Sequence, residues 1–296
     1  MKRWLKRVGI GLGMLVGLSA IALGVLVAIS LARQSTTYEV RPAAIAIPIE
    51  PAALAEGERL WISRGCGDCH AADGAGRVVM DGPPARVVGT NLTVVTRGWP
   101  VEDHLRAIRH GVRPDGSPIT LMPAYEYNPM SDEDVGRIIA HYTSLPRRET
   151  SLPATEVRLL GRVLHALDLF SLYSAERIDH AAPRRAPPAP AETVEYGAHL
   201  AIGCTGCHGE GLSGGPIPGA PPELGDPSNL TPHESGLAGW TRADFVRAMR
   251  EGRRPDGAAI NPAQMPWRNF SRMTDLELHA IWLHLAQLSP RPRGGR

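Results

Sequence analysis

Two copies of one short motif hold every cysteine in the chain and indicate its chemistry. The segments Cys66-Gly67-Asp68-Cys69-His70 and Cys204-Thr205-Gly206-Cys207-His208 share the pattern Cys-X-X-Cys-His. This pattern is the attachment signal for c-type haem. Its two thiols lie about one helical turn apart, so both can add to the vinyl groups of one porphyrin. The histidine that follows then falls beneath the ring, where it can ligate the iron.

Paired cysteines have three other common roles. A disulfide framework suits an exported protein but gives the adjoining histidines no role. A zinc site built from two Cys-X-X-Cys pairs usually has a far shorter spacer than this one. A thioredoxin-like redox pair follows a strand, and the residues before the first motif do not predict one. The two motifs therefore favour two covalently bound haem c groups.

The second iron ligand must come from elsewhere in the chain, and two pairs of methionines qualify. Met122 and Met265 lie in loops, and each is followed by a proline that removes a backbone donor and keeps the loop extended. Met130 and Met273 precede a helix-capping serine or threonine, where an apolar residue packs on the first turn as a hydrophobic staple. We therefore expect Met122 and Met265 to be the axial ligands. His/Met ligation raises the reduction potential of a c-type haem.

Histidine is the rival for this position. His141 and His284 occupy matching places on the helices that close the two copies. Bis-histidine ligation would lower the reduction potential of the haem. More often, a histidine on a helix is solvated or caps the last turn. With both faces of each iron filled, no open position remains for a substrate, so the haems would transfer electrons.

The motifs belong to a longer repeat, whose copies are about 140 residues apart. Each copy contains Gly-x-x-Leu, Cys-X-X-Cys-His, Asn-Leu-Thr, Trp, Arg-Pro-Asp-Gly, Met-Pro and a final Met-Ser/Thr-Asp. These begin at 57, 66, 91, 99, 113, 122 and 130 in the first copy, and at 197, 204, 229, 240, 254, 265 and 273 in the second. The sequence therefore predicts two copies of one domain, at 51–148 and 191–292.

Each copy is expected to contain three helices. The first leads into the cysteines, the second lies mid-domain and the third closes the domain. Their ranges are about 51–64, 100–110 and 131–145 in the first copy and 191–203, 241–251 and 274–288 in the second. Ser131 and Thr274 are natural N-caps, each with an acidic residue three positions on. Strand patterning is poor, so the predicted fold is all-α with long irregular loops.

The N-terminus has the pattern of a membrane anchor. Four basic residues precede an uncharged run of 25 residues, 8–32, and a spanning helix needs about 20. A cleaved signal is the alternative, because Ala20-Ile21-Ala22 has the small residues of a cleavage site. We expect residues 1–32 to be the anchor or signal and 33–50 a tether. The basic residues stay in the cytoplasm, which puts the rest on the periplasmic side.

The two copies are joined by residues 149–190, in which we expect an amphipathic helix and a proline-rich linker. Between 155 and 173 the apolar residues Leu160, Val163, Leu164, Leu167 and Phe170 lie opposite a polar face. A strut packed against one or both lobes is one interpretation. A docking helix for a partner or for the membrane surface is the other.

Composition excludes several classes of protein. Of the 296 residues, 43% are hydrophobic and 21% are charged, which is typical of a globular chain. Without the four N-terminal cations the chain has 28 basic and 30 acidic residues, so nucleic acid is not an expected partner. Only 5% of residues are aromatic, so two hydrophobic cores would have few large apolar side chains unless a bound macrocycle supplies apolar volume.

The combined pattern resembles the cytochrome c subunits of bacterial membrane-bound alcohol, gluconate and aldehyde dehydrogenases. The likeness covers both repeats, about 200 of the 296 residues. It implies tandem class I cytochrome c domains behind the N-terminal transmembrane helix. It also implies that one haem is held by Cys66, Cys69, His70 and Met122, and the other by Cys204, Cys207, His208 and Met265. Those subunits usually carry three such domains, and this chain has two.

The resemblance further implies a relay that carries electrons from a periplasmic dehydrogenase towards quinone or an oxidase. We expect a single-pass inner-membrane dihaem cytochrome with its haem domains in the periplasm. It would be an electron carrier rather than an enzyme. Its partners would be a dehydrogenase, an oxidase, a quinol-oxidising complex or a photosynthetic reaction centre. The alternatives are a dihaem redox enzyme, peroxidase-like or thiosulfate-oxidising, which needs one labile iron ligand, and a haem sensor.

Overall fold

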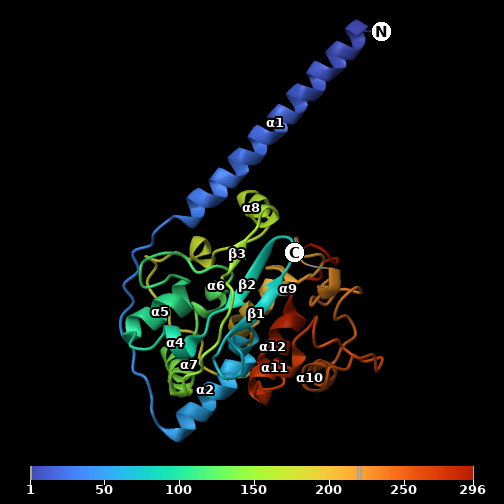
Figure 1. Ribbon diagram of the computed structural model, residues 1–296. Coiled ribbons are helices and arrows are strands. Elements are labelled where there is room, and N and C mark those ends of the chain that lie inside the picture. Colours follow the sequence, from blue (N-terminus) through green and yellow to red (C-terminus); the bar gives the residue numbers. More distant parts are fainter. Residues whose placement is uncertain (1, 219, 221, 296) are drawn as a thin grey trace.

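The computed structural model describes residues 2–218, 220 and 222–295 and shows one long helix that projects from two helical lobes (Figure 1). The projecting helix, α1, runs from Lys2 to Gln34. Its most apolar window has a mean hydropathy of 2.5, and none of that window is buried by the rest of the protein. Among the described residues it is the single helix long and apolar enough to cross a membrane.

Each lobe surrounds its own hydrophobic core. Lobe 1 contains α2 (Pro51–Ser63), α3 (Cys66–His70), α4 (Leu92–Val95), α5 (Val101–His110), α6 (Ala124–Tyr127) and α7 (Asp132–Ser144). Lobe 2 contains α9 (Val194–His208), the short η2 (Pro222–Leu224), α10 (Arg242–Glu251), α11 (Trp267–Phe270) and α12 (Asp275–Gln287). The three long helices predicted for each copy are therefore present.

The closest packing within each lobe is between its first and last long helices, and the Gly-x-x-Leu pair explains it. A Cβ on Gly57 would lie 2.1 Å from the backbone oxygen of Arg137, so α2 and α7 cross at this glycine. In lobe 2 a Cβ on Gly197 would lie 1.8 Å from the backbone oxygen of Ala280, where α9 crosses α12. The leucines three positions on, Leu60 and Leu200, enter the two cores.

The predicted caps of the closing helices are also present. The hydroxyl of Ser131 accepts a hydrogen bond from the Asp134 amide, and that of Thr274 accepts one from the Glu277 amide. Met130 and Met273 are buried in the cores beside the first turns of these helices. They therefore fill the structural role that their position predicts.

The expectation of an all-α fold needs one correction, because lobe 1 includes a small antiparallel sheet. Strands β1 (Arg77–Asp81) and β2 (Ala85–Gly89) form a hairpin, with Arg77 opposite Gly89. The linker adds the short β3 (Glu156–Val157) to the other edge of β2. Each hairpin strand carries a Val-Val pair, and a Gly-Pro-Pro turn joins them. Valine is a strong strand former and this turn reverses the chain, so these short runs contained a strand signal.

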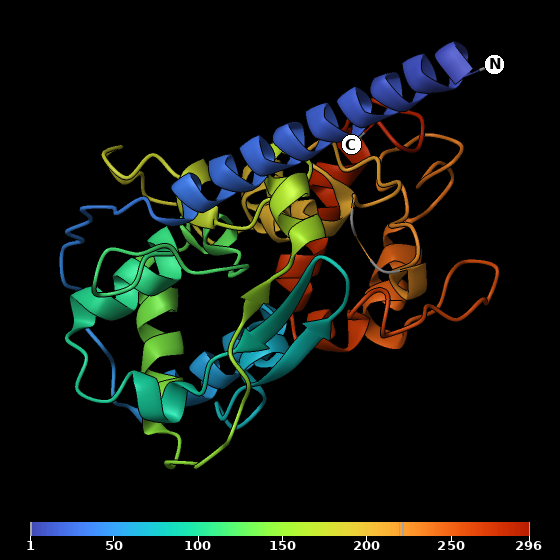
Figure 2. The same ribbon diagram turned by 45° about the horizontal axis from the view of Figure 1, so that its top comes forward.

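The linker passes from β3 into α8 (Leu159–Ala166), a 3₁₀ turn η1 (Ser174–Arg177) and an extended proline-rich segment. The helix α8 packs beside the last turns of α1, as Figure 2 shows. The amphipathic helix is thus shorter than the predicted segment. It packs on α1 and also on the hairpin of lobe 1, since a Cβ on Gly161 would lie 2.2 Å from the Pro84 backbone oxygen.

Candidate haem centres

Both attachment histidines are oriented by a backbone carbonyl. The Nδ1 of His70 lies 2.8 Å from the oxygen of Thr90, and the Nδ1 of His208 lies 2.7 Å from the oxygen of Ser228. An Nδ1–H that donates to a carbonyl leaves Nε2 as the ligating nitrogen. Burial lowers the pKa of His70 and outweighs the opposing effect of the Thr90 carbonyl, so this imidazole is held neutral, the form that binds a metal.

The acceptors are not the carbonyls of the prolines that follow the motifs. At 83–84 and 221–222 the sequence allows two equal interpretations, a carbonyl that orients the histidine or a simple turn. Pro84 instead accepts a bond from the Arg158 amide at the turn of the hairpin, and Pro221 lies outside the described residues. The true acceptors stand directly before Asn-Leu-Thr in both copies, and this repeated position is the signal that could have identified them.

In lobe 2, the attachment motif and the predicted methionine line one cavity. This cavity has a volume of about 420 Å³, and Cys207, His208 and Met265 all border it. Its remaining walls are largely apolar. They include Leu230, Leu237, Trp240, Phe245 and Met249. A crevice of this size, with apolar walls and a few convergent polar groups, is typical of a cofactor site.

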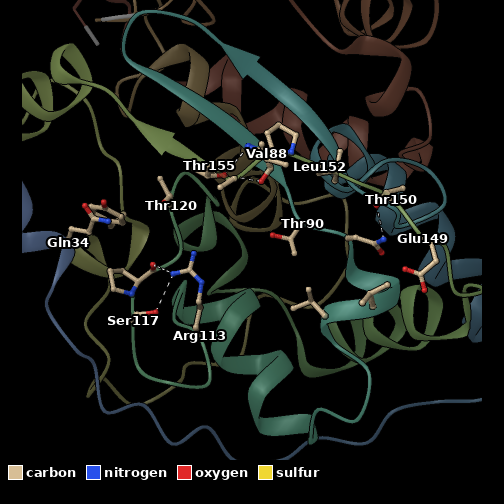
Figure 3. Close-up of a pocket in the computed structure, with 17 residues that line it drawn as sticks. Gln34, Val88, Thr90, Arg113, Ser117, Thr120, Glu149, Thr150, Leu152 and Thr155 are labelled. Carbon is tan, nitrogen blue, oxygen red and sulfur yellow. Dashed lines mark hydrogen bonds between the residues drawn. The ribbon is translucent and has the colours of Figure 1, made fainter.

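In lobe 1, a cavity of about 680 Å³ lies at the corresponding place. Figure 3 shows Thr90, Arg113 and Thr120 around it, the counterparts of Ser228, Arg254 and Asn261 in lobe 2. Linker residues 149–155 form a further wall, and the last residue of α1, Gln34, also borders it. None of Cys66, Cys69, His70 and Met122 borders this cavity, so the structure brings an attachment cysteine, its histidine and the predicted methionine to one cavity in lobe 2 but not in lobe 1.

The rival histidines lie elsewhere. The Cβ of His141 lies 2.9 Å from a Cβ built on Gly57, and that of His284 lies 3.0 Å from one built on Gly197. Both therefore lie at the helix crossings that close the lobes. His284 does not border the lobe 2 cavity, whereas Met265 does.

Burial disfavours the thiolate form at three of the attachment cysteines and raises the pKa of Cys66, Cys69 and Cys204. Burial raises the pKa of Cys66 to about 12, and burial also raises that of Cys204 to about 12. All four cysteines are free of disulfide bonds. Among the described residues, no group of three or more His, Cys, Asp or Glu side chains could hold a metal ion.

The two attachment motifs also meet the opposite lobe in equivalent ways. The amide of Asn269 on α11, four residues after Met265, donates to the Asp68 carboxylate inside the first motif at 2.6 Å. The carboxylate of Glu126 on α6, four residues after Met122, would lie 2.7 Å from a Cβ on Gly206 inside the second motif. Each methionine loop thus leads into a short helix that contacts the other lobe's motif, in a pseudo-two-fold arrangement.

Ion pairs fasten this contact between the lobes. Glu277 of α12 is almost fully buried and accepts hydrogen bonds from Arg59 at 2.7 Å and from Arg64 at 3.3 Å. Burial alone would raise the pKa of Glu277, but the two guanidinium groups and the Thr274 amide outweigh it and lower this pKa. The carboxylate therefore stays ionised and links lobe 2 to lobe 1.

Several histidines to which the sequence assigned no role have structural partners. His104 is buried and hydrogen-bonds the Tyr142 hydroxyl, and His110 pairs with His180 of the linker. His165 of α8 is fully buried, with Ser30 of α1 at 3.0 Å. These contacts join segments far apart in the chain, and nothing in the local pattern indicated them.

Two protein-family models match the chain, one in each repeat. Residues 52–141 match the model described as cytochrome C oxidase, cbb3-type, subunit III, and residues 194–289 match the cytochrome c model. Both matches contain a Cys-X-X-Cys-His motif whose histidine is held by a carbonyl. The chain contains two cytochrome c domains. Such domains carry haem iron and transfer electrons.

Curated relatives match about a third of the chain. The cytochrome c subunit of alcohol dehydrogenase (quinone) from Gluconobacter oxydans is 38% identical over 92 residues, which is 30% of this chain and 19% of that subunit. The fructose dehydrogenase cytochrome subunit of Gluconobacter japonicus is 32% identical over 115 residues, 36% of this chain and 24% of that subunit. The matches thus span no more than about a quarter of these relatives.

Proposed function

We propose that the protein is a membrane-anchored dihaem cytochrome c that passes single electrons between redox partners. The observation that carries the proposal is the cavity of lobe 2, in which Cys207, His208 and Met265 face one space. Two attachment thiols, one imidazole and one thioether form the complete donor set of a His/Met haem c. The same residue types recur in lobe 1 as Cys66, Cys69, His70 and Met122.

The residues present fit the group. The carbonyls of Thr90 and Ser228 favour the Nδ1–H tautomer of both histidines, so each would offer Nε2 as the nitrogen that holds an iron. Arg113 and Arg254 border the two cavities at matching positions and supply positive charge for the carboxylates of a porphyrin. Haem, when bound, supplies the one-electron redox change. The protein supplies burial, ligands and orientation.

The arrangement of the lobes supports a carrier in which both haems belong to one relay. Each methionine loop contacts the other lobe's attachment motif through Glu126 or Asn269. The crevice of lobe 1 is bordered by Gln34 at the end of α1. Lobe 1 is therefore the lobe nearer the membrane and the better placed to exchange electrons with a membrane partner, while lobe 2 would serve a soluble partner or a second subunit.

The partner classes follow from the relatives. Those named above are cytochrome subunits of an alcohol dehydrogenase and a fructose dehydrogenase. We therefore place a dehydrogenase first among the donors, with an oxidase, a quinol-oxidising complex or a photosynthetic reaction centre as the other candidates. The anchor α1 holds the chain in the inner membrane as a single-pass protein, and the basic residues before it put both lobes in the periplasm.

Haem content tests the proposal. The chain is produced with the c-type maturation machinery and purified in mild detergent. Its pyridine haemochrome spectrum should show haem with both vinyl groups saturated, at about two haems per chain, and the haem should resist acid-acetone extraction. One haem per chain, or haem that extracts, would contradict it.

Ligand binding separates the carrier from the enzyme alternative. A haem with His/Met ligation has no open position, so cyanide and carbon monoxide should bind slowly to both irons. Fast binding at one iron would favour a peroxidase-like or thiosulfate-oxidising enzyme instead. A chain that holds two haems but does not exchange electrons with any reduced donor would favour the sensor.

A further inference from the structure

The helix α8 buries its histidine, whereas two of its three leucines are exposed and the third, Leu164, is half-buried. His165 is fully buried, whereas Leu159, Leu160, Leu167 and Leu169 in and just after α8 are between 43% and 55% exposed. A surface helix of a water-soluble protein has the reverse arrangement, with its apolar stripe on the core and its polar face in water. The outward face of α8 therefore calls for an apolar surrounding.

The polar groups of this segment all have partners inside the protein. Arg158 pairs with Asp81 of the hairpin at 2.6 Å, and Arg162 donates to Gln34 at 3.0 Å. The ring of His165 contacts Ser30 and Glu176. These bonds hold the rotation of α8 in place, so the leucines remain on its outer side.

Asp168, the one carboxylate among the outward leucines, is also paired. It lies 2.8 Å from Arg33 of α1, and Arg33 also binds Glu176. These two ion pairs join the segment after α8 to the last turn of α1. The charge of Asp168 is thereby offset at the outer surface.

The place of α8 along α1 identifies what surrounds it. A hydrocarbon core of about 30 Å is crossed by about 20 helical residues, so the run from Val8 to about Val27 is enough to span it. The partners of α8 on α1 are Ser30, Arg33 and Gln34, which follow that span. Figure 1 shows α8 beside the end of α1 that meets the lobes. With α1 as the anchor, these residues would lie at the level of the lipid headgroups.

We propose that α8 and the leucines that follow it form a second membrane contact, which lies in the interface of the bilayer beside α1. An interfacial helix buries its apolar face at the boundary between headgroups and acyl chains, which is the surrounding that the outward leucines require. The proposal rests on α1 being the membrane anchor. It adds a fixed orientation, because one spanning helix can rotate and tilt, whereas a second contact beside it sets which side of the lobes faces the bilayer.

Lipid photolabelling tests the contact. The full-length haem protein is placed in nanodiscs that contain a diazirine-bearing phospholipid, irradiated and digested, and labelled peptides are identified by mass spectrometry. Peptides from α1 and from 159–169 should both carry label. The peptide around Ile49 serves as the background, since Ile49 is 82% exposed but precedes α2, at the end of the lobes away from α1 (Figure 1).

A variant shows whether the leucines cause the labelling. In the double variant Leu160→Gln, Leu169→Gln, the label on 159–169 should fall about tenfold, equivalent to about 1.4 kcal/mol of lost membrane contact. The label on α1 and the haem content should not change. The matched control Ile49→Gln, an equal change at an exposed apolar residue, should leave all labelling unchanged.

The outcomes separate this inference from the proposed anchor. Label on α1 with only background on 159–169 would overturn the second contact and leave the anchor in place. Label on 159–169 that persists in the double variant would also overturn it, because the leucines would then not be what holds α8 at the lipid. Absence of label from α1 itself would overturn the anchor, and the second contact with it.

Discussion

The buried carboxylate of Glu277 should be the strongest single link between the lobes. Its side chain is 5% exposed, and it accepts from Arg59 at 2.7 Å, from Arg64 at 3.3 Å and from the Thr274 amide at 2.7 Å. Removal of one member of a buried ion pair costs about 3 to 5 kcal/mol, because the partner charge stays buried. Arg59 keeps a second partner in Glu56, which favours the low end of that range. Glu277→Ala should therefore lower the free energy of unfolding by about 3 kcal/mol, including the lost cap.

The measurement is urea unfolding of the haem protein in detergent at pH 7, followed by far-ultraviolet circular dichroism. Asp134→Ala is the matched control, since Asp134 holds the same capping position in lobe 1 but pairs only with Arg137, at 3.5 Å. It should cost less than about 1 kcal/mol. The pKa of Glu277 is lowered by folding, so its contribution is present above the pKa of the unfolded chain and is lost as the pH falls through the lower folded value. Equal losses in the two variants would refute an ion-pair link between the lobes.

Three further predictions concern the haem sites and the contact between them. Met265→Ala should remove the sulfur-to-iron absorbance of one haem at the red end of the spectrum and lower the reduction potential of that haem. Met273→Ala should keep the absorbance and instead lower the free energy of unfolding by about 2 to 5 kcal/mol. The opposite result would exchange the roles of the two methionines. Gly89→Ala puts a Cβ 1.8 Å from the Cys69 carbonyl and should reduce haem content by about one per chain, whereas Gly82→Ala, with its nearest atom at 3.8 Å, should keep both haems. Burial raises the pKa of Glu126 to about 7, so folding favours its protonated form, and the melting temperature should fall as the pH rises from about 5 to 8. Glu126→Gln should flatten this dependence, and an unchanged slope would show that another group titrates.

The predictable parts of the fold are those that depend on short, local sequence patterns. The closing helices could be placed because Ser131 and Thr274 cap them through a residue three positions away. The crossings at Gly57 and Gly197 were visible as a repeated Gly-x-x-Leu, although the sequence did not say which helix each glycine meets. The hairpin could have been predicted from its paired valines and proline turn, but five-residue strands give little periodicity.

The contacts between distant segments were not predictable, because they depend on how the finished lobes fit together. Arg59 and Glu277 are 218 positions apart, and neither differs locally from a solvated surface residue. The amphipathic pattern between 155 and 173 left two interpretations open, a strut against the lobes and a docking helix for a partner or the membrane surface. A pattern of apolar and polar faces fixes two sides of a helix without stating which side meets protein. At α8 the polar partners on α1 decide this.

The repeat itself explains why the contact between the lobes has two equivalent halves. Two copies of one domain present the same two surfaces. When the first surface of one copy meets the second surface of the other, a pseudo-two-fold rotation brings the remaining two surfaces together in the same way. Here the paired surfaces are the helix after the methionine loop and the third residue of the attachment motif. In one half, Asn269 bonds to Asp68, and in the other the larger Glu126 fits against Gly206. The side chains differ, but in each half a small or hydrogen-bonding residue of the motif complements the helix it meets. This arrangement holds both attachment motifs against the opposite lobe, so haem bound covalently at each motif would have a defined orientation relative to the other.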